Sequence, residues 1–209
     1  MSFRRVLFVS AHADDALVGA GGYAHRLSLE GVEVSHIVFT LSEKNNGIGF
    51  SADELRAELI LAENRVGFDH VYTFSFPVHH LSEHGEEIRE KLAELKKELK
   101  PDLVLCPSLN DRHQDHSAVA AETIRVFRNS ETVLSYELLR NSVHVFNPNV
   151  YAIISSDQLE EKLRMLAVFK TQTSRPYMNP ENFRALARMR GVQVGESYAE
   201  AFECLKVII

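Results

Sequence analysis

The chain has 209 residues, of which 45% are hydrophobic and 25% are charged, and this balance predicts one soluble globular domain over residues 1–209. The formal net charge of −6 and the lack of any block of Lys or Arg exclude nucleic acid as the main partner. Only Cys106 and Cys204 occur, which excludes a disulfide framework or a cysteine-based zinc module and favours the cytoplasm.

The predicted elements alternate along the chain. In order, we predict a strand at 6–9, a helix at 16–30, a strand at 34–40, a helix at 51–65, strands at 71–76, 103–106 and 133–136 separated by helices at 86–100 and 117–128, a strand at 150–154, and helices at 159–169 and 183–190. The apolar run at 6–9 is too short for a signal peptide, and no segment approaches the ~20 apolar residues of a membrane span.

Local signals mark several of these boundaries. Gly31 stops the first helix, Ser51 and Glu54 form a capping box that opens the second, and Pro101 ends the third. The strands are apolar on both faces and alternate with helices, which is typical of a parallel sheet covered by helices. We therefore predict a Rossmann-like three-layer α/β sandwich with a mostly parallel sheet and a C-terminal strand and helical segment.

The first strand ends in polar residues. Segment 10–15 reads SAHADD, so an imidazole and two adjacent carboxylates follow a buried strand directly and precede a helix. Burying such groups is costly unless a cation compensates them. One aspartate could be an ordinary helix N-cap, but this explanation leaves the other aspartate and His12 unexplained. We interpret the loop as part of a functional site.

The fourth strand ends in a second polar loop, which reads NDRHQDH at 110–116. His113 and His116 would share one face of a helix that begins here. The alternative is a solvated loop in which Asp115 is an N-cap. Both loops project from the edge of the sheet where α/β folds form their sites. Together they offer two nitrogen ligands and one oxygen ligand, the set that holds a catalytic zinc and leaves a position for water.

Other motifs fit less well. The glycines at 19–22 lack the G-x-G-x-x-G spacing of a dinucleotide site, and no P-loop lysine follows them. We expect these glycines to let the helix pack closely on the sheet. Ser10, Ser108 and Ser117 lie near the polar loops, but none stands in a nucleophile-elbow pattern.

The two polar segments resemble the PIG-L / LmbE-like family of zinc-dependent N-deacetylases, to which N-acetylglucosaminyl-phosphatidylinositol de-N-acetylase belongs. AHADD at 11–15 and GAGG at 19–22 match the first signature, Ala-His-Pro-Asp-Asp followed by Gly-x-Gly-Gly. DRHQDH at 111–116 matches the second, Asp-x-His-x-Asp-His. A weaker likeness continues through 136–137, 171–172, 190–195 and 198–202.

The metal ligands that the resemblance implies are His12, Asp15 and His116. It further implies that Asp14 is the general base, that His113 stabilises the oxyanion or protonates the leaving amine, and that Asp115 is the carboxylate partner of His113. We expect Asp115 to raise the pKa of His113 and keep it positively charged. The implied metal is zinc, although a His-Asp-His site also accepts iron(II) or cobalt(II).

The chain departs from the family pattern at a few positions. Ala13 replaces the usual proline, Ala16 stands where many members have glutamate, and Phe169 lies near a position where many have histidine. None of these changes removes an implied ligand. We expect them to alter the substrate rather than the reaction.

The resemblance implies hydrolysis of an N-acetyl group on a small molecule that contains an amino sugar, by a protein that often self-associates. Two alternatives remain open, an amidase acting on a thiol conjugate or other small amide, and a metal- or sugar-binding protein without turnover. Candidate pocket residues are Asn46, His79, His80, Arg112, Asn141, Arg175, Tyr177 and Tyr198. The histidines that we assign to ordinary surface or core positions are His25, His36, His70, His84 and His144.

Overall fold

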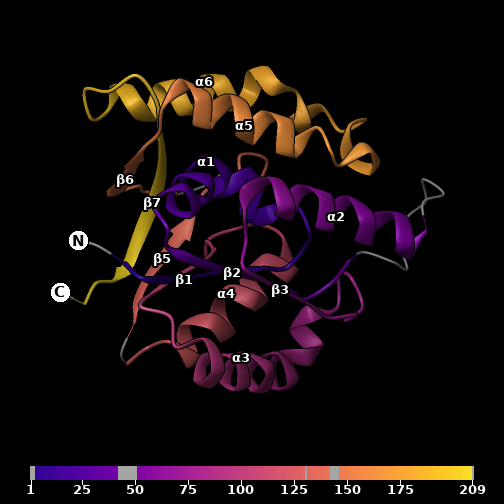
Figure 1. Ribbon diagram of the computed structural model, residues 1–209. Coiled ribbons are helices and arrows are strands. Elements are labelled where there is room, and N and C mark those ends of the chain that lie inside the picture. Colours follow the sequence, from indigo (N-terminus) through magenta and orange to yellow (C-terminus); the bar gives the residue numbers. More distant parts are fainter. Residues whose placement is uncertain (1–2, 42–50, 130, 142–145, 209) are drawn as a thin grey trace.

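The computed structural model describes residues 3–41, 51–129, 131–141 and 146–208 (Figure 1). The strands are β1 (Arg5–Ser10), β2 (Glu33–Val38), β3 (His70–Thr73), β4 (Leu103–Pro107), β5 (Thr132–Tyr136), β6 (Val150–Ile153) and β7 (Ala199–Lys206). The α-helices are α1 (Asp15–Leu29), α2 (Ala52–Val66), α3 (Gly85–Leu99), α4 (Gln114–Val126), α5 (Ser156–Leu166) and α6 (Pro180–Val192). Three 3-10 turns are η1 (Leu81–His84), η2 (Lys170–Gln172) and η3 (Pro176–Met178).

All seven strands form one sheet in the order β3-β2-β1-β4-β5-β7-β6. The first five of these are parallel, and β7 pairs antiparallel with both β5 and β6. Helices α3 and α4 cover one face, while α1 and α2 lie on the other, with α5 and α6 outside them (Figure 1). The predicted α/β sandwich with a mostly parallel sheet is confirmed.

The two faces of the sheet carry separate hydrophobic cores. Val6 and Phe8 of β1 belong to the core under α1 and α5, whereas Leu7 and Val9 belong to the core under α3 and α4. All four side chains are buried. This two-sided burial explains why the central strands are continuously apolar rather than alternating.

Gly19 of α1 packs closely on the sheet, as predicted for the glycines of this helix, whereas Gly21 faces Lys162 of α5. A Cβ atom on Gly19 would lie 2.4 Å from Cδ2 of Tyr136, which no side chain can tolerate. The helix is kinked at Ala20, whose φ is −150°. Next to this kink, the carboxylate of Glu200 on β7 accepts hydrogen bonds from the backbone N–H groups of Gly22 and Tyr23 at 3.1 and 2.6 Å.

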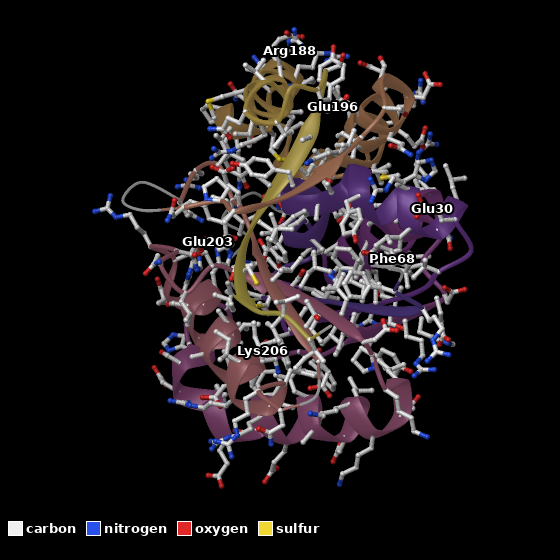
Figure 2. All side chains as sticks on the ribbon, turned by 90° about the vertical axis from the view of Figure 1, so that its left-hand side faces the viewer. Glu30, Phe68, Arg188, Glu196, Glu203 and Lys206 are labelled. Atoms are coloured by element: carbon white, nitrogen blue, oxygen red, sulfur yellow. The ribbon has the colours of Figure 1, made fainter. Side chains whose placement is uncertain are left out.

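A C-terminal strand was expected, but the bounds of β7 and its place inside the sheet were not. β7 lies between β5 and β6 in the sheet. It begins at Ala199, shortly after Glu196 and beside α6, and ends at Lys206 near the end of α4 (Figure 2). The bounds of β7 were hard to predict because it contains Glu200, a charged residue that is nevertheless buried. The backbone of α1 and Nζ of Lys162, at 2.6 Å, form hydrogen bonds with its carboxylate. None of the helices in the described ranges combines the length and hydropathy that crossing a bilayer requires.

Candidate metal centre and active site

The ends of two neighbouring strands build the site. β1 and β4 are parallel, with Phe8 opposite Leu105, so the loops that follow them meet at one edge of the sheet. Helix α4 begins at Gln114 rather than at the predicted Ser117. His116 therefore lies in the first turn of α4, facing the start of α1.

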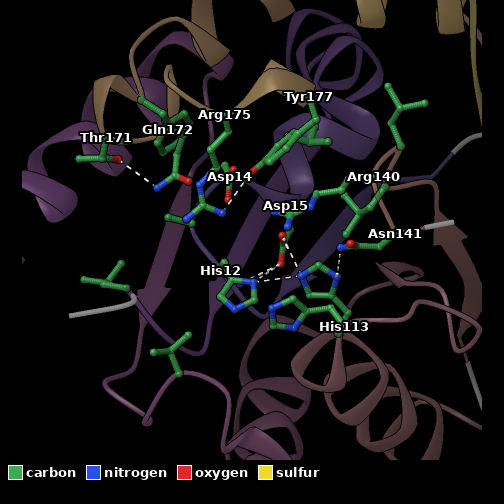
Figure 3. Close-up of a pocket in the computed structure, with 18 of the residues that line it drawn as sticks. His12, Asp14, Asp15, His113, Arg140, Asn141, Thr171, Gln172, Arg175 and Tyr177 are labelled. Atoms are coloured by element: carbon green, nitrogen blue, oxygen red, sulfur yellow. Dashed lines mark hydrogen bonds and ion pairs between the residues drawn. The ribbon is translucent and has the colours of Figure 1, made fainter. Parts of the chain in front are cut away.

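Ligand-type atoms of three side chains converge at this edge (Figure 3). Nδ1 of His12 lies 3.0 Å from Nε2 of His116, and Oδ1 of Asp15 lies 3.2 Å from the same nitrogen. The second carboxylate oxygen of Asp15 lies 3.5 Å from Nδ1 of His12. Ligands bound tetrahedrally to zinc at their usual distances stand about 3.4 Å apart. The three side chains implied as metal ligands are thus together, with a spacing that fits one divalent ion.

A carboxylate behind each ring fixes its orientation. Oδ2 of Asp111 lies 2.8 Å from Nδ1 of His116, and Oδ2 of Asp115 lies 3.2 Å from Nε2 of His12. Such contacts select the tautomer in which the opposite nitrogen presents its lone pair. No role was assigned to Asp111 from the sequence. Its place in the DRHQDH segment was the only sequence feature that pointed to it.

Protons compete with a cation for this cluster. Burial lowers the pKa of His12, but Asp15 and Asp115 outweigh it and raise that pKa to about 9. In the same way, Asp15 and Asp111 overcome burial and raise the pKa of His116 to about 10. Only one proton fits between two ring nitrogens that are 3.0 Å apart. The metal-free pair therefore holds one extra proton that a divalent cation would replace.

Asp14 stands beside the converging atoms and lines the same pocket. It occupies the N-cap position of α1, but its side chain makes no capping hydrogen bond, so the simple N-cap explanation does not account for it. Burial and the neighbouring carboxylate of Asp15 raise the pKa of Asp14. A carboxyl group of this kind is suited to accept and return a proton.

The structure corrects the predicted pairing of His113 with Asp115. Nδ1 of His113 accepts a hydrogen bond from the backbone N–H of Asp115 at 3.2 Å, which leaves the proton on Nε2. The Asp115 carboxylate instead faces His12 and accepts from the backbone N–H groups of His79 and Leu81 at 2.7 and 3.2 Å. Burial and the two nearby histidine rings lower the pKa of His113 to about 4. His113 is therefore a neutral hydrogen-bond donor, not the imidazolium that we predicted.

A pocket of about 730 Å³ opens in front of these groups. The predicted wall residues that line it are His79, Asn141, Arg175 and Tyr177. The predicted wall residues that lie elsewhere are His80, Arg112 and Tyr198, and Asn46 is outside the described residues. His144, predicted to hold an ordinary surface or core position, is also outside them. Arg140 and Gln172 also line the pocket, and nothing in the sequence singled out Arg140. Phe169 lines it too, so the departure at this position changes the pocket wall.

A second polar cluster lies beneath the site, between the sheet and α2. His36 on β2 contacts Oε1 of Glu63 through Nδ1 at 2.6 Å and Oγ of Ser10 through Nε2 at 2.8 Å. Ser10 in turn contacts the hydroxyl of Tyr136 at 3.2 Å. All four side chains are buried. His36 was predicted to hold an ordinary surface or core position, and the structure places it in the core. The network that holds it was not predicted.

Comparisons with known proteins identify a family and several relatives of this chain. The family model described as PIG-L, GlcNAc-PI de-N-acetylase, matches residues 7–127. The diacetylchitobiose deacetylase of Thermococcus kodakarensis is 24% identical over 94% of this chain and 81% of its own length. The conserved protein TT1542 of Thermus thermophilus superposes with a TM-score of 0.84 at 25% identity, covering 98% of this chain and 96% of that one.

Two further solved structures have the same fold. The N,N'-diacetylchitobiose deacetylase of Pyrococcus horikoshii superposes with a TM-score of 0.82 at 23% identity, over 98% of this chain and 84% of its own. The 4-carboxy-2-hydroxymuconate hydratase GalB of Pseudomonas putida KT2440 gives 0.77 at 17% identity, over 98% of both chains. The fold thus serves more than one reaction, whereas the family model matches the segment that carries both polar loops. The chain belongs to the PIG-L family of GlcNAc-PI de-N-acetylase-like proteins.

Proposed function

We propose that the protein is a metal-dependent N-deacetylase that removes the acetyl group from a small molecule containing an amino sugar. The observation that carries this proposal is the convergence of His12, Asp15 and His116 to within 3.5 Å of one another, beside Asp14 in an open pocket. Membership of the PIG-L family and the likeness to a diacetylchitobiose deacetylase support the substrate class.

Zinc is the proposed metal, held by the two imidazoles and the Asp15 carboxylate, since two nitrogen donors and one oxygen donor form a common catalytic zinc set. Iron(II) and cobalt(II) suit the same donors. When bound, the metal would lower the pKa of a water molecule to about 7 and polarise the acetamide carbonyl.

Asp14 would carry the proton through the reaction. Its carboxylate takes a proton from the attacking water, and its raised pKa helps it to hold that proton. When the carbon–nitrogen bond breaks, Asp14 returns the proton to the leaving nitrogen. One amide and one water then give acetate and a free amino group.

His113 would act by donating a hydrogen bond. Its Nδ1 is occupied by the backbone N–H of Asp115, so its Nε2–H is the group that can face the substrate. Directed at the carbonyl oxygen, this donor stabilises the negative charge that develops during attack. A neutral imidazole can serve this purpose, because donating the hydrogen bond does not require a second ring proton.

Acetate release from a panel of N-acetylated amino sugars, with and without a chelator, tests the proposal. We expect release from at least one sugar, loss of release with chelator, and recovery when zinc is added back. Release that a chelator leaves unchanged would rule out the metal role. Hydrolysis of thiol-conjugate amides alone would favour the amidase alternative, and sugar binding without any release would favour a binding protein.

We also propose that residues 1–209 form a single deacetylase domain that works in the cytoplasm and self-associates. The continuous seven-stranded sheet supports one domain, because strands from the first and last parts of the chain are neighbours in it. Sedimentation of the purified chain would give its assembly state, with a mass above one copy as the expected result.

A further inference from the structure

Two arginines stand on one wall of the pocket. Arg140 follows β5, Arg175 lies between η2 and η3, and both line the pocket that contains Asp14 and Asp15. Arg140 is exposed and Arg175 is half-buried, so both guanidinium groups are open to a bound molecule. Within the described ranges, neither arginine forms a salt bridge with an aspartate or a glutamate.

Tyr177 brings the two positive charges together (Figure 3). The guanidinium carbon of Arg140 lies over the ring of Tyr177, 5.5 Å from its centre. A terminal nitrogen of Arg175 lies 3.5 Å from the hydroxyl oxygen of the same tyrosine. A cation over an aromatic face is stabilised by the ring, which helps to hold Arg140 in place. One side chain thus positions both arginines.

This arrangement is costly unless something compensates it. Two guanidinium groups that share one tyrosine repel each other, and in the described part of the chain no salt bridge to a carboxylate offsets this repulsion. Arginine presents a planar fork of N–H donors that matches the oxygens of a carboxylate or a phosphate. In a chain whose net charge is −6, such a wall would also draw an anion to a site that it would otherwise avoid.

We propose that the substrate carries an anionic group, a phosphate or a carboxylate, that Arg140 and Arg175 bind while its N-acetyl group lies at the cluster of His12, Asp15 and His116. This inference rests on the proposed deacetylase function and narrows its substrate class. The anion contributes affinity and orientation, and the acid–base step at Asp14 is unchanged. The aromatic ring of Tyr177 additionally offers a surface for the apolar face of a sugar.

Matched neutral and anionic sugars test the inference. We would compare N-acetylglucosamine and its methyl glycoside with the 1-phosphate, the 6-phosphate and N-acetylmuramic acid, using the zinc-loaded protein. We expect at least one anionic compound to show a kcat/KM about 10- to 100-fold above its neutral counterpart, the range of a charge-assisted contact. The difference should lie mainly in KM and should shrink at high salt. The phosphate and carboxylate arms identify which anion is preferred.

Arginine variants assign the preference to this wall. Arg140→Gln and Arg175→Gln should each lower the anionic-to-neutral ratio of kcat/KM by about tenfold. Arg112→Gln removes an exposed arginine outside the pocket lining and should leave the ratio unchanged. Equal kcat/KM for anionic and neutral sugars would overturn the inference while leaving the deacetylase proposal intact.

A binding measurement keeps the inference testable if no sugar is deacetylated. Calorimetry with the 6-phosphate and the 1-phosphate should then show binding that weakens about tenfold in Arg140→Gln or Arg175→Gln and stays unchanged in Arg112→Gln. Binding that none of the variants alters, or no binding to any anionic sugar, would overturn the anion site. Absence of acetate release together with arginine-dependent binding would contradict only the proposed function.

Discussion

Two histidine–carboxylate clusters both draw on the segment 10–15, which gives Ser10 to the inner cluster and His12 and Asp15 to the outer one, and their geometries differ. In the inner cluster both ring nitrogens of His36 are occupied, by Glu63 at 2.6 Å and by Ser10 at 2.8 Å. In the outer cluster, one nitrogen of His12 and one of His116 face an orienting carboxylate. The other two nitrogens lie 3.0 Å apart and also face the Asp15 carboxylate, at 3.5 and 3.2 Å. Of these two clusters, the outer one has donor atoms that converge.

The comparison separates residue type from chemical role. Ser10, His36 and Glu63 have the identities and contacts of a nucleophilic triad, yet all three are buried, so no substrate can reach the serine. His12 and Asp14, only a few residues further along, line an open pocket. We infer that the inner cluster stabilises the fold and the outer one performs the chemistry.

The largest effect on turnover should come from Asp14→Asn. An amide cannot accept the proton of the attacking water, so kcat should fall by at least ~100-fold, the scale of a positioned base. Metal content should be unchanged, because the ligand atoms belong to other residues. An Asp14→Asn protein that retains its metal and turns over at the wild-type rate would refute this role.

The inner cluster should affect stability instead. His36→Ala leaves the Glu63 carboxyl group buried without its partner, which should lower the free energy of unfolding by about 3 kcal/mol in urea titrations. His70→Ala, at an exposed position on β3, should change it by less than about 0.5 kcal/mol. Metal stoichiometry should be the same in both variants. A His36→Ala protein that unfolds like the wild type but no longer binds metal would reverse the assignment of the two clusters.

A smaller effect should follow from loosening the support of the outer cluster. Asp111 orients His116 through its Nδ1 at 2.8 Å, so Asp111→Asn should weaken metal binding by about 10- to 100-fold. Competition with a chromophoric chelator measures this change. The exposed Asp157→Asn variant serves as the control, and equal affinities in the two variants would show that the orienting contact is dispensable.

The smallest effect concerns protons. The raised pKa values of His12 and His116, about 9 and 10, mean that the metal-free site holds an extra proton at neutral pH. A histidine in the unfolded chain has a pKa of about 6.5, and below that pH the extra proton stabilises the metal-free folded protein fully. This contribution disappears as the pH rises through about 9. Metal binding near pH 7 should release about one proton, so affinity should rise about tenfold per pH unit. Calorimetry in buffers of different ionisation enthalpy counts the proton, and no release would contradict the proposed ligand set.

The sequence predicted the elements whose signals are local. The capping box at Ser51 forms as expected, with Glu54 N–H donating to Oγ of Ser51 at 3.2 Å, and the central strands follow their apolar runs. The two polar loops meet because β1 and β4 are neighbours in a parallel sheet. The close packing of Gly19 on Tyr136 was also predictable, since helical glycines beside a sheet have few other uses.

Features that depend on distant contacts could not be predicted. β7 can lie inside the sheet because the backbone of α1 and the side chain of Lys162 form hydrogen bonds with the buried carboxylate of Glu200. No local sequence pattern predicts these partners. The partner of Asp115 was predicted as His113 but is His12, 103 residues away. Arg140 reaches the pocket only because the chain turns there after β5. Such pairings depend on the fold as a whole and cannot be predicted from a local segment. The residues that follow each strand, in contrast, can be read directly from the sequence.

Metal binding to the purified chain tests the central claim most directly. After metal removal, we would titrate zinc into the wild-type protein and into His116→Ala, with circular dichroism to verify that both are folded. We expect one tightly bound ion per wild-type chain and its loss in the folded variant. Tight binding of the same stoichiometry and affinity in His116→Ala, or no tight binding in the wild type, would contradict the central claim.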